Sequence, residues 1–202
     1  MNTIHFDQLP APKQKRIIDA SIKEFSGNGY GSASLNKIVK AAGISKGSLF
    51  NYFNNKSSLF LFVYDIALKN VKQYLRAVRD ETEAQPFFER LEKIMHAGVD
   101  FIKLHPRLAR IYFRILYTSD SPHNQEILVE LRKLSGAYLI EIVQEGILNG
   151  DLNPNLNVER AVFIIDSVLN RFLHECHQYS GEMDLEAWIS DLKDLFARGM
   201  KK

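Results

Sequence analysis

The chain has 202 residues, of which 46% are hydrophobic and 25% charged, a composition that provides for a buried core in one or two domains. Its longest unbroken apolar run, 59–64, is far shorter than the ~20 residues of a membrane-spanning helix, and the N-terminus has no charged-then-apolar signal pattern. We therefore expect neither a membrane nor a secreted protein. The single cysteine, Cys176, excludes an internal disulfide or a thiolate cluster and fits a reducing cytoplasm.

The charge is distributed unevenly along the chain. Residues 1–60 contain 8 Lys and Arg against 3 Asp and Glu, a net charge of +5, whereas residues 61–202 contain 18 against 21, a net charge of −3. A basic N-terminal third favours an anionic partner, of which nucleic acid is the commonest; the alternative is a solvated basic face.

The predicted elements are helices throughout. Apolar residues recur at helical spacing, and no stretch of five or more residues alternates strictly enough for a strand, which predicts an all-α fold. We expect a loose arm over 1–11, and a first helix that is stopped by Gly27, Gly29 and Gly31. The helices are expected at about 13–26, 35–42, 46–53, 56–79, 87–104, 107–117, 123–148, 157–179 and 184–199.

The second and third helices have the spacing of a helix-turn-helix. Gly43 suits the left-handed residue that ends a helix, Ile44 can enter the core, and Ser45 can cap the following helix. Leu49 and Phe53 point back to the core. The remaining positions of this unit are expected to approach bases or phosphates, with Gly47 leaving room for a phosphate at the helix N-terminus. They are Ser34, Lys37, Lys46, Gly47, Ser48, Asn51, Tyr52 and Lys56.

Residues 13–60 resemble the signature of the TetR/AcrR transcriptional regulators. The matching positions are Arg16-Ile-Ile-Asp-Ala, Phe25, Gly29-Tyr30, Ile38, Ala42-Gly-Ile-Ser-Lys-Gly-Ser-Leu-Phe50, Tyr52-Phe53 and Lys56. The resemblance implies a recognition helix that contacts DNA through Ser45, Lys46, Ser48, Phe50, Asn51 and Tyr52, with Lys56 on a phosphate. Phe50 stands where the family commonly has tyrosine, so it lacks a hydroxyl that could contact a DNA phosphate. Val39 stands where alanine is usual, so the two short helices are expected to pack slightly further apart unless Ala41 or Ala42 compensates. The alternative is a helix-turn-helix that serves only packing or protein binding.

The resemblance implies two domains: an N-terminal three-helix bundle with the helix-turn-helix over 1–55, and an antiparallel helical ligand-binding and dimerisation domain over 56–202. The second domain is expected to hold a small-molecule pocket. Its candidate polar groups, taken from helical-wheel positions beside apolar faces, are Asn70, His105, Tyr138, Glu145, Asp166 and Asn170.

Two features of the rear helices have competing interpretations. The polar stripe formed by Asp166, Asn170, His174 and His177 has three possible interpretations: the lining of a ligand pocket, a polar part of a dimer interface, or a solvent-exposed surface. With Cys176, its two histidines provide too few ligands for a metal site, so no metal is expected. The aromatic residues of this region are typical of an ordinary core and, less often, of a ligand pocket, which slightly favours an apolar or aromatic effector.

The last two helices are the predicted dimer interface, because packing the apolar stripe of 184–199 with the 157–179 helix against a symmetry mate would give the four-helix bundle that the family resemblance implies. An intrachain core position is the alternative for Trp188. The predicted interface residues are Val168, Phe172, Leu185, Trp188, Ile189, Leu192, Leu195 and Phe196.

No phosphate-binding loop, nucleophile elbow or metalloprotease motif occurs, so we expect neither an enzyme nor a cofactor. The sequence predicts a homodimeric transcriptional regulator, a repressor that a small-molecule effector releases from a pseudo-palindromic double-stranded DNA operator. The alternatives are a ligand-independent or activating regulator of the same fold, and one whose input is a protein partner.

Overall fold

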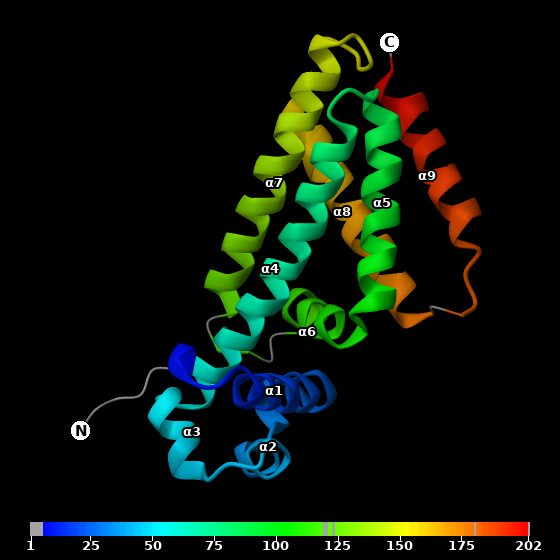
Figure 1. Cartoon of the computed structure of the whole chain (residues 1–202). Helices are drawn as coiled ribbons and strands as arrows, with labels where there is room; N and C mark the ends of the chain where they lie inside the picture. The colour runs from blue at the N-terminus through cyan, green and yellow to red at the C-terminus, as the bar shows by residue number, and fades with distance from the viewer. Residues whose placement is uncertain (1–5, 119–120, 123, 180, 202) are drawn as a thin grey trace. The chain divides into compact units, whose positions relative to one another are not determined.

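The computed structural model describes residues 6–118, 121–122, 124–179 and 181–201 (Figure 1). Its described residues contain no β-strand, which confirms the all-α fold. None of their helices has the length and apolarity needed to cross a membrane. In chain order the elements are η1 (Phe6–Gln8), α1 (Ala11–Ser32), α2 (Leu35–Ala42), α3 (Lys46–Tyr52), α4 (Lys56–Thr82), α5 (Phe87–Leu104), α6 (Pro106–Tyr117), α7 (Asn124–Leu148), α8 (Val158–Gln178) and α9 (Leu185–Met200).

Two predictions for the N-terminal residues are wrong. The first helix does not stop at Gly27: α1 continues to Ser32, and its backbone leaves the helical conformation only at Gly29 (φ 70°, ψ 180°). The described part of the arm is not loose, because the buried Phe6 ring packs against the rings of Phe53 and Phe62, with centroids 5.2 and 4.9 Å away. Such buried aromatic contacts fix a segment that has little structure of its own. Residues 1–5 of the predicted arm lie outside the described residues.

The chain forms two compact units, and α4 contributes to both. Unit 1 takes its residues from Met1–Asn70 and Arg107–Asn124, so it includes nearly all of α6. Unit 2 takes its residues from Val71–Pro106 and Gln125–Lys202. The functional division into 1–55 and 56–202 stays a prediction.

The core of unit 1 receives an apolar face from each of its first four helices. Ile17 and Phe25 of α1, Ile38 of α2, Leu49 of α3 and Leu59 of α4 are at most 1% exposed. Burying a side chain of this size contributes about 1.5–3 kcal/mol, so this core holds α3 by its inner face. The opposite face of α3 is left to solvent.

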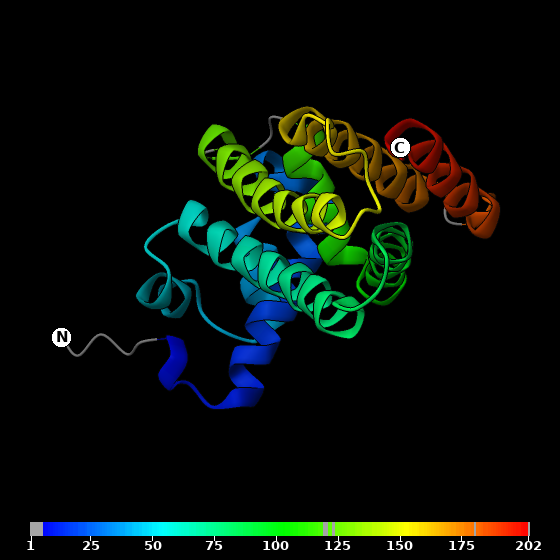
Figure 2. The same cartoon turned by 90° about the horizontal axis from the view of Figure 1, so that it is seen from above.

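In unit 2, α5 packs against both α8 and α9 (Figure 2). The loop after α7 also holds α5, because the Asp151 carboxylate accepts a hydrogen bond from the Phe87 N–H at 2.8 Å and so caps the start of that helix. In the same loop, the Asn153 N–H donates to the Met200 carbonyl at 2.9 Å. These two bonds tie α5, the α7–α8 loop and α9 together at one end of the unit.

Candidate DNA-binding site and effector domain

The turn between α2 and α3 is fixed by the residues at the two helix ends. Ser34 Oγ accepts a hydrogen bond from the Lys37 N–H (3.4 Å), and Ser45 Oγ accepts one from the Ser48 N–H (3.0 Å), so each serine caps its helix. Gly43 has φ 65° and ψ 41°, a left-handed conformation that costs a residue with a Cβ about 1–2 kcal/mol. The predicted end of α2 and the predicted cap of α3 are both confirmed.

Helix α1 holds α2 at both ends. The Arg16 Nε–H donates to the Ala42 carbonyl at the end of α2 (3.2 Å), and the Glu24 carboxylate accepts from the Ser34 N–H at its start (2.9 Å). Ala42 is fully buried and Val39 is 9% exposed, and compensation between them stays a prediction. The orientation of the helix-turn-helix is therefore set by two charged side chains of α1.

The outer face of α3 carries side chains suited to DNA. Leu49 and Phe53 are buried, as predicted, which turns Lys46, Phe50 and Asn51 to the solvent. The Phe50 side chain is 39% exposed, and the Lys46 Nζ lies 6.0 Å from its ring centroid. The ammonium can contact phosphates or guanine, and the amide can form a bidentate pair with adenine.

Two lysines flank this face and are held by aromatic rings. Lys13 Nζ donates to the Tyr52 hydroxyl at 3.1 Å, and Lys56 Nζ donates to the Gly31 carbonyl at 3.0 Å while lying 4.8 Å from the Tyr30 ring centroid. Sequence reasoning missed Lys13, since its partner is 39 positions away and no local pattern marks it.

The other predicted DNA-binding residues differ in what they do. Lys37 and Gly47 are exposed, and a Cβ on Gly47 would approach nothing closer than the Ser45 Oγ, at 3.9 Å. The hydroxyls of Ser34 and Ser45 cap α2 and α3, and the Ser48 hydroxyl lies 2.9 Å from that of Ser45. These serines hold the two helices in place.

The predicted ligand-binding residues do not form one cluster. Asn70 belongs to unit 1, where its amide donates to the Ile66 carbonyl at 2.8 Å. In unit 2, the Asn170 amide donates to the Asp166 backbone carbonyl at 2.9 Å. Both amides therefore bond to the preceding turn of their own helix, a local arrangement that wheel arithmetic does not reveal.

His105 lies in an aromatic cluster of unit 2. Its Nε2 is 3.4 Å from the Tyr74 hydroxyl, and its ring centroid lies 5.8 Å from that of Tyr74 and 5.4 Å from that of Phe101. The cluster joins the end of α5 to α4 and gives the half-buried imidazole a polar partner.

Glu145 pairs with Arg90, which sequence reasoning missed, and the charge of Arg90 also acts on Tyr138. Arg90 is 4% exposed, and its Nη1 pairs with the Glu145 carboxylate. The Arg90 Nε and the Tyr138 hydroxyl are buried without a hydrogen-bond partner among the described residues. Burial raises the pKa of Tyr138, while the charge of Arg90 lowers it. Arginine is usually a surface residue, so its sequence position on α5 gave no signal.

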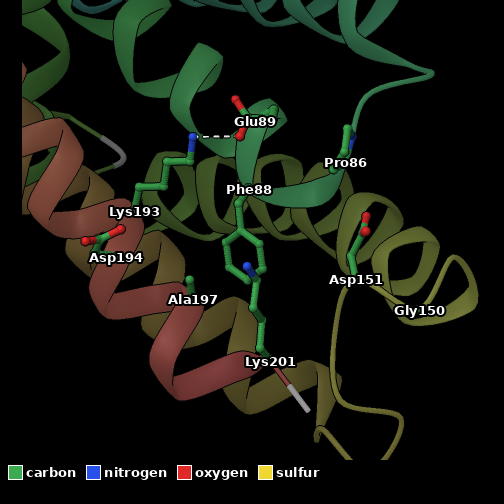
Figure 3. Close-up of a pocket in the computed structure, with 9 residues that line it drawn as sticks. All are labelled: Pro86, Phe88, Glu89, Gly150, Asp151, Lys193, Asp194, Ala197 and Lys201. Carbon is green, nitrogen blue, oxygen red and sulfur yellow. Dashed lines mark hydrogen bonds and ion pairs between the residues drawn. The ribbon is translucent and has the colours of Figure 1, made fainter.

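A groove of about 410 Å³ opens elsewhere in unit 2 (Figure 3). Its lysines are engaged: Lys193 pairs with Glu89 and Glu92 at 2.7 and 2.6 Å, and the Lys201 Nζ lies 5.1 Å from the Phe88 ring centroid. The groove is lined by Pro86, Phe88, Glu89, Gly150, Asp151, Lys193, Asp194, Ala197 and Lys201. None of them was predicted as a ligand contact.

The predicted dimer residues divide into buried and exposed groups. Phe172, Ile189 and Phe196 are at most 7% exposed and belong to the core of the chain itself, whereas Trp188 and Leu195 are 49% and 65% exposed. The Trp188 ring stacks on Phe172 with centroids 6.4 Å apart. Val168, Leu185 and Leu192 are half-buried. Sequence reasoning did not include two exposed apolar residues of α8, Phe163 and Ile164, among the interface residues.

The thiol and imidazoles of α8 do not make a reactive site. Cys176 is 2% exposed, and burial raises the pKa of its thiol to about 11. Burial also lowers the pKa of His174. Within the described ranges, no group of three or more His, Cys, Asp or Glu side chains has the geometry to hold a metal ion.

A capped helix-turn-helix that presents basic, amide and aromatic side chains, joined to a larger helical unit, defines a DNA-binding transcriptional regulator. Residues 17–63 match the model of the bacterial regulatory proteins of the tetR family, and residues 85–201 match the model of the tetracyclin repressor-like C-terminal domain. The chain belongs to the TetR family.

Several relatives match along nearly their full length. The fatty acid metabolism regulator protein of Bacillus subtilis (strain 168) is 24% identical over 193 residues, which cover 94% of this chain and 96% of that protein. The crystal structure of a TetR family transcriptional regulator from Chloroflexus aurantiacus J-10-FL has a TM-score of 0.74 and 29% identity, and covers 98% of this chain and 97% of that one. FadR from Bacillus subtilis, in complex with stearoyl-CoA, has the same fold, with a TM-score of 0.76 and 22% identity over 92% of this chain and 98% of that one.

Proposed function

We propose that this chain is a homodimeric repressor that binds a pseudo-palindromic operator through α3 and releases it when a small-molecule effector binds in unit 2. The observation that carries the DNA part is the outer face of α3, where Lys46 and Asn51 are exposed on a helix anchored by Leu49. Lys13 and Lys56 flank that face and add positive charge for the phosphates.

Exposed apolar side chains on α8 and α9 support the dimer. Phe163, Ile164, Trp188 and Leu195 are 72%, 52%, 49% and 65% exposed, which is more apolar surface than two neighbouring helices of a monomer usually show. Ile164 and Leu195 also line a groove of about 360 Å³ together with Leu156. A two-fold contact over this surface would join two copies of the chain, and the two copies of α3 would then have to meet successive major-groove faces of one operator, about 34 Å apart.

Sedimentation of two variants tests the dimer. Leu195→Glu places a charge in the proposed interface and is expected to give monomers that bind the operator weakly, because each half-site is then bound alone. Val129→Glu is the control, since Val129 is 66% exposed on α7, outside the proposed surface. A Leu195→Glu protein that remains a dimer would place the interface elsewhere.

Selection of genomic fragments by the purified protein tests the DNA part. The wild type is expected to enrich one pseudo-palindromic site, and the double variant Lys46→Ala/Asn51→Ala to lose it. Removing one phosphate contact, as in Lys37→Ala, is expected to lower the slope of log affinity against log salt by about 0.9 while leaving the preferred sequence unchanged. Sequence-blind binding by the wild type would contradict the proposal.

The effector part rests on the relatives and on unit 2. FadR from Bacillus subtilis was solved with stearoyl-CoA, so this compound is the first to titrate against the complex with operator DNA. Release at a saturable stearoyl-CoA concentration is the expected result. Because α4 contributes to both units, it is the simplest carrier of a change from effector to DNA. Operator affinity that is unchanged by acyl-CoA compounds of every chain length would contradict this choice of effector, and an unchanged affinity across other small molecules would favour a ligand-independent regulator.

A further inference from the structure

Arg90 is placed unusually for a charged residue. It is 4% exposed, and buried arginines need compensating partners because taking the charge out of water is costly. Its described partner is Glu145, whose side chain is 41% exposed against 5% for Arg90. The pair therefore joins a fixed, buried cation to a carboxylate that water can also solvate.

The Arg90 guanidinium has unused hydrogen-bonding capacity. A guanidinium presents five N–H groups in a planar fork that matches the oxygens of a carboxylate or phosphate. Glu145 takes a hydrogen bond from Nη1, and the buried Nε has no acceptor among the described residues. An unpaired buried donor is unfavourable, so an anion that reached both nitrogens would be bound more strongly than in water.

The Tyr138 hydroxyl is a second unused group in the same region. It is buried, with no hydrogen-bond partner in the described part of the chain, and it lies on α7 two turns before Glu145, a spacing that puts both side chains on the same face of that helix. Burial raises the pKa of Tyr138, which keeps the hydroxyl protonated and able to donate. Both unsatisfied groups are thus hydrogen-bond donors, the chemistry that an anion requires.

The residues one turn away are apolar. Phe87 and Ile94 flank Arg90 on α5, Ile142 lies between Tyr138 and Glu145 on α7, and all three are at most 6% exposed. An anion bound here would have apolar surroundings apart from these donors, which favours a ligand with a charged group on an apolar body.

We propose that Arg90 and the Tyr138 hydroxyl bind the carboxylate or phosphate group of an organic anion, which displaces Glu145 from Arg90. This inference rests on the proposed role of unit 2 in effector binding and names the chemical class of the effector. Glu145 is then the resident counter-ion that keeps Arg90 neutralised until the ligand arrives, and it turns to water when displaced.

Direct binding, measured by calorimetry without DNA, tests the site. The probes are decanoate, decyl phosphate and decanol, which share one apolar chain and differ in the headgroup. The wild type is expected to bind at least one of the two anions at least about tenfold more tightly than decanol, the usual scale of a charge-assisted pair. The tighter of the two anions identifies the headgroup as carboxylate or phosphate.

Four variants separate a binding role from a structural one. Arg90→Met is expected to lose most of the preference for the anion, and Arg90→Lys, which keeps the charge but loses the fork, to retain part of it. Tyr138→Phe is expected to weaken anion binding several-fold, and Glu145→Gln to tighten it, because the competing carboxylate is gone. Arg198→Gln is the control: its side chain is 80% exposed and pairs with Asp194 at 3.9 Å, so anion affinity should stay within about twofold.

Several results would overturn the proposal: equal affinity for decanol and the anions, no anion binding by the wild type, or anion affinity that is indifferent to Arg90 and Glu145 variants that still fold. Its failure is distinguishable from that of the proposed function. If stearoyl-CoA releases operator DNA equally well from wild type and Arg90→Met, the proposed repressor function is supported and the proposed anion site is refuted. If anions bind through Arg90 but leave operator affinity unchanged, the anion site is supported and effector-induced release of the operator is refuted.

Discussion

Gly146 of α7 lies against Leu152 and against Phe87, the first residue of α5, next to the Arg90–Glu145 pair, and replacing this glycine by alanine tests that packing. A Cβ on Gly146 would lie 3.0 Å from the Leu152 Cδ1 and 3.1 Å from both Cβ and Cδ2 of Phe87. Leu152 and Phe87 are each 1% exposed, so neither can move aside into solvent. Overpacking of this kind costs roughly 1–3 kcal/mol of unfolding free energy.

The same helix supplies a matched control. Apart from its own stretch of helix, no described residue comes within 4 Å of a Cβ added at Gly136, so Gly136→Ala gains the helix preference of alanine, about 1 kcal/mol, without a clash. Gly146→Ala receives that gain too. The difference between the two variants is therefore the overpacking cost alone, roughly 1–3 kcal/mol, and Gly146→Ala should be net destabilised by up to about 2 kcal/mol.

Urea unfolding followed by the fluorescence of Trp188, the single tryptophan and a residue of unit 2, measures both values at one fixed protein concentration. Leu152→Val removes the Cδ1 atom that a Cβ at position 146 would meet. It should therefore lower the free energy of unfolding less in the Gly146→Ala background than in the wild type. Equal stabilisation by the two alanines, with the same urea dependence, would refute the reasoning, because α7 would then not be in close contact with α5 at this position.

Three further predictions follow from single side chains. Ser45→Ala should lower the stability of unit 1 by about 1 kcal/mol and weaken operator binding, whereas Ser45→Asn, an equally good cap, should do neither. If Ser45→Ala changed neither stability nor operator binding, the cap would not be what positions α3. Cys176, with its pKa raised to about 11, should react with a disulfide reagent at pH 8 only as fast as the protein opens, and rapid reaction of the native protein would contradict its burial. Lys193 lowers the pKa of Glu92 through a hydrogen bond, so that pair stabilises the fold above the ordinary pKa of 4.5 and is lost as the pH falls through the lowered value. The difference in Tm between wild type and Lys193→Met should accordingly shrink between about pH 7 and pH 3, and a constant difference would rule out the pair as its source.

The helix-turn-helix could be predicted from sequence because its determinants are local. The cap residues of α2 and α3 accept hydrogen bonds from amides three residues along the chain. Gly43 is required by the left-handed backbone conformation of the turn in which it lies. The inward position of Leu49 follows from helical period alone. The same locality explains the errors: Gly29 breaks the helical conformation but does not end α1, since the chain resumes one further turn that tertiary packing holds.

Unit 2 was predictable as helices but not as a site. Wheel positions selected Tyr138 and Glu145 correctly as polar groups beside an apolar face, and equally selected Asn70 and Asn170, whose amides bond to their own helices. A helical wheel gives the direction of a side chain and not the identity of what it meets. It therefore cannot distinguish an amide satisfied locally from a hydroxyl left unsatisfied.

The sequence by itself determined the all-α class, the helix-turn-helix and its caps, because each depends on residues a few positions apart. Only the tertiary structure decided which residues of α8 and α9 are core and which are exposed, since both kinds share one apolar stripe. It also decided that Arg90 is buried against Glu145, 55 positions further along the chain. A contact of that separation depends on how whole helices pack, and side-chain chemistry at either position says nothing about it.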